Sequence, residues 1–132
     1  MKTILVVDDE YALVETLADL LEDEGYRVIS AANGDAGLSR LEEEKPDLIL
    51  TDFMMPIADG LHLIRGVRAI PECRDLPIVM MSSVSKSVAL SLRPKGDELH
   101  ISGYLDKPFQ LDELLELVQR LIGKGETKTR KP

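Results

Sequence analysis

The sequence has few of the residues that would support metal or thiol chemistry. It contains one cysteine and two histidines among 132 residues. The single Cys73 excludes an internal disulfide, and neither it nor a histidine has partners at a metal-ligand spacing. We therefore expect neither a zinc site nor cysteine-based catalysis.

Long apolar runs are also lacking. No stretch approaches the ~20 apolar residues that span a membrane. The opening MKTILVV meets Asp8 and Asp9 at once, so it does not form the apolar region of a signal peptide. We expect a soluble cytoplasmic protein with no membrane partner.

Positive charge is scarce outside the last nine residues. The formal net charge is −8, and residues 124–132 hold four basic residues and one acidic residue. Residues 1–123 therefore carry 12 basic against 23 acidic residues, a net charge of −11. A body with this charge repels nucleic-acid phosphates, so we expect no direct nucleic-acid binding by it.

The length of the chain and its 44% hydrophobic content fit one domain with its own core. Short apolar runs alternate with amphipathic stretches, which predicts five strand-helix units. The predicted strands are residues 3–7, 26–31, 47–51, 77–81 and 101–106. The predicted helices lie between Glu10 and Gly25, from Asn33 to Glu44, from Asp59 through Val67, from Lys86 to Arg93 and from Leu111 to Ile122. This alternation predicts an α/β fold, a doubly wound parallel sheet with helices on both faces. The domain would cover residues 1–122, with 123–132 as a polar, basic tail or linker.

Polar side chains follow four of the predicted strands. They are Asp8 and Asp9, Asp52, Ser82 and Lys107. In open parallel sheets, ligands bind outside the carboxyl ends of the strands. Three carboxylates, a hydroxyl and an ammonium group would therefore meet at one edge, provided that the first and third strands are neighbours.

Three carboxylates in one pocket repel one another. Two unit charges about 4 Å apart repel by roughly 4 kcal/mol at an effective dielectric constant near 20. Either one carboxylate takes up a proton or a cation lies among them, and an all-oxygen site suits Mg²⁺. A carboxylate beside a metal, a hydroxyl and a lysine can attack a phosphoryl donor. Singly, each residue also has an ordinary structural explanation, such as a helix cap or a turn.

Five motifs in this order resemble the receiver domain of two-component response regulators. They are VVDDE at 6–10, LILTDFMMP at 48–56, DG at 59–60, PIVMMSS at 77–83 and GYLDKPF at 103–109. The resemblance covers residues 3–122. It implies a flavodoxin-like sheet of five strands in the order 2-1-3-4-5.

The resemblance also implies a role for each acidic residue. Asp52 would be the phosphoacceptor. Asp9 and Asp52 would bind Mg²⁺ directly, together with the backbone carbonyl of Met54, and Asp8 would act through a water molecule.

Further roles implied by the resemblance concern the phosphoryl group after transfer. Lys107 would pair with it, preceding a cis Pro108, and the Ser82 hydroxyl would follow it. Tyr104 matches the aromatic residue whose side-chain rotamer reports the state of the site to the surface.

The function implied is that of a phosphorylation-switched receiver in a phosphorelay. A histidine kinase or histidine phosphotransfer protein would donate the phosphoryl group, and the domain would catalyse only its own phosphorylation and dephosphorylation. The family suggests a monomer or a phosphorylation-dependent dimer, with an output partner that the sequence does not name.

Three alternatives stay open. A phosphorylation-independent, receiver-like scaffold would be free to lose Asp52 or Lys107. The second alternative is a phosphohydrolase that resembles the haloacid dehalogenases, but such a protein would carry D-x-D where this chain has DDE at 8–10. The third is flavin binding, which would need a hydroxyl-rich loop after the first strand, where this chain has Asp8 and Asp9.

Three features depart from the family pattern. The stretch from Ser82 to Lys107 is longer than usual, and Gln110 predicts a weakly capped last helix. Met54 and Val84, two residues beyond Asp52 and Ser82, are apolar and cannot guide an attacking water, which predicts a long-lived phosphoryl group.

Overall fold

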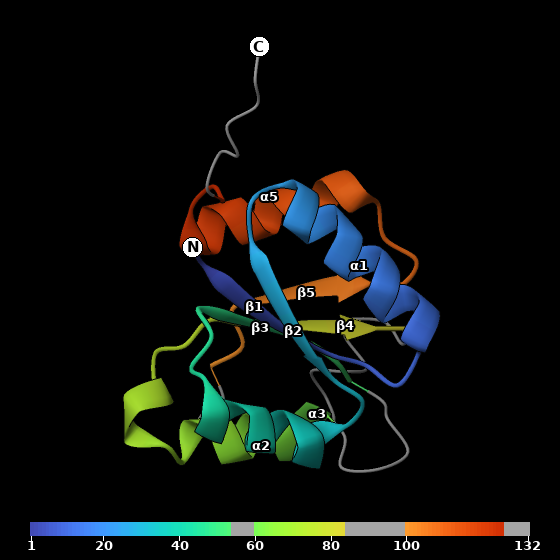
Figure 1. Cartoon of the computed structure of the whole chain (residues 1–132). Coiled ribbons are helices and arrows are strands. Elements are labelled where there is room, and N and C mark those ends of the chain that lie inside the picture. The colour runs from blue at the N-terminus through green and yellow to red at the C-terminus, as the bar shows by residue number, and fades with distance from the viewer. Residues whose placement is uncertain (54–59, 84–99, 126–132) are drawn as a thin grey trace.

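The computed structural model describes residues 1–53, 60–83 and 100–125. Five parallel strands form one sheet in the order β2-β1-β3-β4-β5 (Figure 1). The strands are β1 (Thr3–Val7), β2 (Arg27–Ala31), β3 (Leu48–Asp52), β4 (Ile78–Ser82) and β5 (Gly103–Asp106). The predicted fold class and strand order are thus confirmed. We call the end where the strands begin the amino edge of the sheet, and the other end the carboxyl edge.

Burial explains the apolar runs of the sequence. Every residue of β1, β3 and β4 is buried, as expected for the interior strands of a sheet covered on both faces. The outer strands β2 and β5 contain exposed residues. Two predicted strands end one residue early, because Asp52 and Ser82 are the last residues of β3 and β4 rather than the first residues after them.

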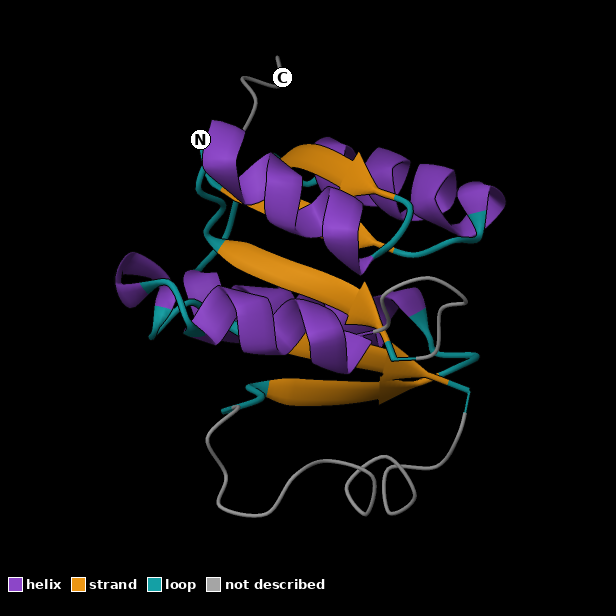
Figure 2. Cartoon of the chain, turned by 90° about the horizontal axis from the view of Figure 1, so that it is seen from below, coloured by secondary structure: helices purple, strands orange, loops and turns teal. Residues whose placement is uncertain are grey.

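The helices form one layer on each face of the sheet (Figure 2). They are α1 (Tyr11–Asp23), α2 (Gly34–Glu43), α3 (Gly60–Arg68) and α5 (Leu111–Ile122), with a short 3-10 turn, η1 (Pro71–Cys73). Alternate residues of β1 serve the two faces. Ile4 and Val6 pack with the side chains of α1 and α5, whereas Leu5 and Val7 pack with those of α3. The predicted helix from Lys86 to Arg93 lies outside the described residues.

Side chains fix the starts of two helices. The Asn33 side chain accepts a hydrogen bond of 2.8 Å from the Ala36 amide, so it caps α2 as predicted. At α5, the prediction of a weak start is wrong. Glu113 Oε1 accepts from the Gln110 backbone amide at 3.0 Å, and acidic residues in the first turn complement the helix dipole.

Polar groups at the amino edge join distant parts of the chain. The Tyr26 hydroxyl donates to the Gly123 carbonyl at 2.6 Å, and Lys2 Nζ donates to the Ile122 carbonyl. A Cβ built at Gly125 would lie 2.3 Å from the Glu24 carbonyl oxygen. The chain is therefore held against the turn between α1 and β2 as far as Gly125.

Arg68, the last residue of α3, forms a second link at this edge. Its Nη1 lies 2.9, 3.0 and 2.8 Å from the carbonyls of Cys73, Arg74 and Leu76, and its Nη2 donates to His100 at 2.6 Å. One guanidinium group thus connects the end of α3 with the residues that lead into β4 and β5.

Among the described helices, none is long and apolar enough to cross a membrane.

Candidate functional site

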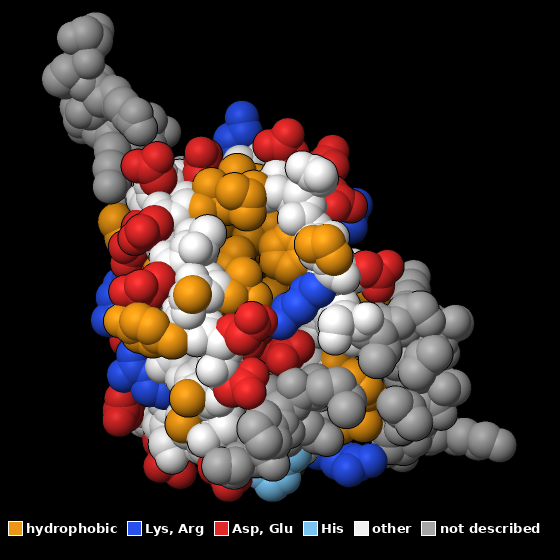
Figure 3. Space-filling view, turned by 90° about the vertical axis from the view of Figure 1, so that its right-hand side faces the viewer, with side chains coloured by type: hydrophobic (Ala, Val, Ile, Leu, Met, Phe, Trp, Pro, Cys, Tyr) orange, Lys and Arg blue, Asp and Glu red, His pale blue; other side chains and the backbone are white. Residues whose placement is uncertain are grey.

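The carboxyl edge brings the predicted polar residues together. Asp8 follows β1, Asp52 ends β3, and these two strands are neighbours in the sheet. Lys107 follows β5, and its backbone amide donates to the Ser82 carbonyl at 2.7 Å. Figure 3 looks onto this edge and shows acidic side chains gathered around a basic one, beside an exposed apolar surface.

Lys107 is the cation at the centre of this cluster. Its Nζ lies 2.9 Å from Asp8 Oδ2, 3.4 Å from Asp52 Oδ1 and 3.5 Å from Glu10 Oε1. The peptide bond between Lys107 and Pro108 is cis, as the resemblance implies. Sequence reasoning did not single out Glu10, although the third position of DDE was a signal that could have located it.

Asp8 has two structural partners besides its place in the cluster. Its side chain is fully buried, one oxygen bonds to Lys107, and the other accepts from the Glu10 amide at 2.9 Å. The second bond turns the chain from β1 into α1. Asp8 therefore connects the entry of the first helix to the charged cluster.

The electrostatics of the site bear out the predicted repulsion. Burial, and then the charge of Asp8, raise the pKa of Asp52 to about 6 from its ordinary value of 3.8, although Lys107 acts in the opposite direction. Burial lowers the pKa of Lys107, but its hydrogen bond to Asp8 and the charges of Asp8 and Asp52 together raise it above its ordinary value. Burial and the neighbouring Asp8 carboxylate thus disfavour the charged form of Asp52, and Lys107 offsets them only in part.

The three aspartates can hold a divalent cation. One oxygen each of Asp8, Asp9 and Asp52 lies within 4.8 Å of the others, with Asp8 and Asp52 buried and Asp9 exposed. Carboxylate oxygens with open access to water suit Mg²⁺. Met54, whose carbonyl was predicted as a further ligand, lies outside the described residues.

The two predicted switch residues lie on adjacent strands. Ser82 is buried at the end of β4, opposite Asp106 in the register. Tyr104 in β5 pairs with Met80 and packs against the core on the α3 face of the sheet. Ser82 therefore lies at the charged edge, whereas Tyr104 lies further back along the sheet.

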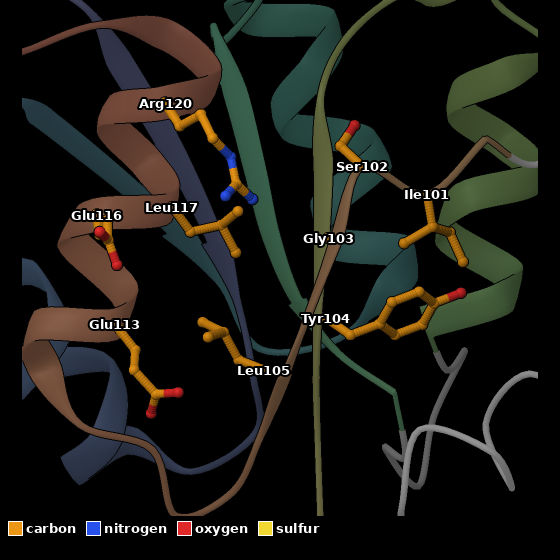
Figure 4. Close-up of a pocket in the computed structure, with 9 residues that line it drawn as sticks. All are labelled: Ile101, Ser102, Gly103, Tyr104, Leu105, Glu113, Glu116, Leu117 and Arg120. Atoms are coloured by element: carbon orange, nitrogen blue, oxygen red, sulfur yellow. The ribbon is translucent and has the colours of Figure 1, made fainter.

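A cleft of about 450 Å³ lies between β5 and α5 (Figure 4). None of the three site aspartates lines it. Glu113, Glu116 and Arg120 of α5 line it together with Leu105 and Leu117. In Figure 4 the Tyr104 ring points away from α5, on the opposite side of β5 from Leu105. The Tyr104 ring therefore packs on the α3 face of β5, although the residue is also one of those that line the cleft.

Known proteins share both the sequence pattern and the fold. The family model of the response regulator receiver domain matches residues 4–119. The alkaline phosphatase synthesis transcriptional regulatory protein PhoP of Bacillus subtilis is 37% identical over 125 residues, covering 95% of this chain and 50% of PhoP. Sporulation initiation phosphotransferase F of the same organism is 30% identical over 119 residues, covering 90% of this chain and 92% of that protein.

A solved structure adds a metal-bound relative. The response regulator TrrA of Thermotoga maritima, in complex with Mg²⁺-BeF, superimposes with a TM-score of 0.77 at 33% identity and covers 92% of this chain and 99% of TrrA. The chain spans about half the length of PhoP and of the phosphate regulon regulators that it also matches.

Proposed function

Since this chain belongs to the response regulator receiver domain family, we propose that it is a phosphorylation-switched receiver whose phosphoacceptor is Asp52. Asp52 ends the central strand β3 at the carboxyl edge. The observation that carries the proposal is the convergence of Asp8, Asp9 and Asp52 with Lys107 at this edge. Asp52 belongs to β3, which lies between β1 and β4, and both of these strands carry other residues of the site. Asp8 and Asp9 follow β1, which has such a neighbour on one side only.

The chemistry follows from these groups. A carboxylate oxygen of Asp52 attacks the phosphorus atom of a phosphohistidine, and the bond between phosphorus and the imidazole nitrogen breaks. The leaving nitrogen keeps the electron pair. With the other ring nitrogen of the phosphohistidine protonated, the products are a neutral imidazole and an acyl phosphate on Asp52. Lys107 Nζ, 3.4 Å from Asp52 Oδ1, is close enough to pair with an oxygen of the transferred group. Water later hydrolyses the acyl phosphate, so the domain acts on itself and not on a separate substrate.

Asp8, Asp9 and Asp52 would hold Mg²⁺, in agreement with the cation present in the TrrA complex. A bound cation would neutralise charge on the phosphoryl oxygens and on the carboxylates that repel one another. As the family resemblance implies, Asp8 would contact the cation through a water molecule, while one of its oxygens keeps the bond to Lys107. Met54 would add its backbone carbonyl.

We assign the response to Ser82 and Tyr104. The Ser82 hydroxyl would donate to a phosphoryl oxygen, and the Tyr104 side chain would move into the space that the Ser82 loop vacates. A shift from 1% to 99% of the active state needs about 5.5 kcal/mol of differential binding. Two or three charge-assisted hydrogen bonds of about 1.5 to 3 kcal/mol each supply this amount.

A histidine kinase or a histidine phosphotransfer protein would be the phosphoryl donor, as in a phosphorelay. The similarity to a sporulation phosphotransferase supports this part of the proposal. The output would be a change in the surface that partners recognise, because the acidic body of the domain does not attract nucleic acid.

The test is the intact mass of the protein after incubation with acetyl phosphate, with and without Mg²⁺. We expect a single phosphoryl adduct that requires Mg²⁺ and is absent from Asp52→Asn. The matched control is Asp19→Asn, which changes an exposed carboxylate of α1 and should leave the adduct unchanged. A phosphotransfer protein that carries phosphohistidine should then replace acetyl phosphate as the donor.

Failure of the wild-type protein to form an adduct, with the fold intact by circular dichroism, would overturn the proposal. The phosphorylation-independent scaffold would then be the better description. An adduct that survives in Asp52→Asn would instead assign the phosphoryl group to another residue.

A further inference from the structure

A threonine hydroxyl is buried in the core next to the phosphoacceptor. Thr51 is completely buried and lies on the same face of β3 as Ile49 and Phe53. Its neighbours across the sheet are Val7 and Met80, and both belong to the apolar core on that face. Valine has the same shape as threonine and no polar atom to bury, so apolar packing alone favours valine at this position.

Within the described part of the chain, the hydroxyl bonds to the backbone of the proposed phosphoacceptor. Thr51 Oγ1 donates to the Asp52 carbonyl oxygen at 3.0 Å. This bond lies inside the core, where an amide that loses its partner cannot turn to water. The hydroxyl therefore fixes the peptide group that joins Asp52 to Phe53.

The first residue of α3 also packs against this carbonyl. A Cβ built at Gly60 would lie 2.5 Å from the Asp52 carbonyl oxygen, so the helix backbone packs directly against it. The Gly60 amide also donates to the Phe53 carbonyl at 3.1 Å. Two independent contacts thus hold the backbone at the end of β3.

The Asp52 carboxylate lies 3.4 Å from Lys107 Nζ, which is closer to Asp8. The carboxylate also accepts a hydrogen bond from the Phe53 backbone amide. That amide belongs to the peptide group that Thr51 holds, so the direction of the carboxylate depends on this peptide group. We propose that Thr51 is a positioning residue for phosphoryl transfer, and that its hydroxyl orients Asp52 by holding the Asp52 carbonyl. This inference rests on the proposed function of Asp52.

The experiment compares Thr51→Val, Thr51→Ser and Thr51→Ala with the wild-type protein. The rate of adduct formation is measured with acetyl phosphate at saturating Mg²⁺. Thr51→Val keeps the shape and removes the hydroxyl, and we expect it to lower the rate about tenfold, as the loss of one buried hydrogen bond allows. Thr51→Ser keeps the hydroxyl and should retain most of the wild-type rate, although it deletes a buried methyl group.

Unfolding by urea separates positioning from stability. All rates are measured where each variant is folded, so a purely structural role predicts equal rates for the three variants. Should Thr51→Val fail to fold, the pair Thr51→Ser and Thr51→Ala still differs by the hydroxyl alone. Thr3→Val, the same change in a buried threonine at the amino edge, should not alter the rate.

Each outcome has one meaning. A slow Thr51→Val and a fast Thr51→Ser support the inference. Equal rates in Thr51→Val and wild type, or a Thr51→Ser as slow as Thr51→Val, overturn it while the adduct itself upholds the proposed function. If the wild-type protein forms no adduct, the proposed function fails first, and the inference fails with it.

Discussion

At the amino edge of the sheet, charged side chains donate to backbone carbonyls, whereas at the carboxyl edge several carboxylates gather around Lys107. Arg68 and Lys2 bond to carbonyl groups from distant segments and connect them. Asp8 and Asp52 are buried near each other and share the charge of Lys107. The first arrangement stabilises the fold, and the second costs stability, because like charges are held close together.

The difference shows how one small domain divides its tasks. Proteins hold strained or repelling groups at functional sites only where the rest of the structure keeps them in place. Here the segments that lead into β1, β4 and β5 are anchored at the opposite edge of the sheet. Variants at the two edges should therefore have effects of opposite sign.

The largest effect is expected for Arg68→Ala at the amino edge. It removes a guanidinium group whose Nη1 lies within hydrogen-bond distance of three carbonyls and whose Nη2 donates to a fourth. Because Nη1 carries two N–H groups, these contacts amount to about three full hydrogen bonds, and at about 1 kcal/mol for each we expect a loss of about 3 kcal/mol in the free energy of unfolding. Urea denaturation measures this loss. Arg65→Ala, on the exposed side of the same helix, is the control and should change stability little. A small effect of Arg68→Ala would show that water replaces its bonds readily.

The second prediction concerns Asp52→Asn at the carboxyl edge, which should raise the free energy of unfolding. In metal-free protein the folded state raises the pKa of Asp52 from 3.8 to about 6, so it binds this proton more tightly than the unfolded state does. The contribution of Asp52 to stability therefore falls as the pH rises from about 3.8 to 6, and stays low above that. Asp52→Asn does not titrate, so it should exceed the wild type by about 2 to 3 kcal/mol at pH 8.

The measurement is urea denaturation in EDTA at several pH values from 4 to 8. The difference in the free energy of unfolding between Asp52→Asn and wild type should vanish near pH 4 and grow as the pH rises. Asp19→Asn controls for loss of an exposed carboxylate. A difference that does not depend on pH would mean that Asp52 is not destabilised by its surroundings.

A smaller effect is expected for Tyr26→Phe, which removes the hydrogen bond to the Gly123 carbonyl. We expect a loss of about 1 kcal/mol, the usual net value of one hydrogen bond. Tyr11→Phe provides a matched control, because the side chain of Tyr11 is exposed at the start of α1. Thermal unfolding compares the two, and equal shifts would rule out a stabilising role for the Tyr26 hydroxyl.

The smallest effect is expected for Glu10→Gln. Glu10 approaches Lys107 at 3.5 Å, but its side chain is 67% exposed, and solvent screens its charge. We expect a change within about 0.5 kcal/mol, of either sign, by urea denaturation. A larger gain in stability would show that Glu10 is also one of the carboxylates that repel one another at the carboxyl edge.

The sequence alone located much of the site, because strand ends can be read from local patterns. The apolar runs before Asp8, Asp52 and Ser82 indicated strands, and parallel strands deliver their ends to one edge. The strand order came from the family resemblance. The prediction for the start of α5 was wrong, since it considered only the side chain of Gln110 and not the bond that the Gln110 amide donates to the Glu113 carboxylate.

Other features depend on contacts that no local pattern reveals. Arg68 reaches carbonyls up to 32 residues away, and Tyr26 bonds to a residue 97 positions later. The Thr51 bond is local in sequence, but its importance depends on burial and on the approach of Gly60. These contacts form only after the tertiary structure has brought the segments together.

The bond from Lys2 to Ile122 places the beginning of the first strand beside the end of the last helix, at the edge opposite the acidic cluster. A fluorescent protein, an affinity tag or a solid support attached next to Lys2 or Ile122 would thus leave the acidic cluster facing outward. The same geometry suits a sensor in which a label near Gly123 stays out of the path of an approaching phosphoryl donor.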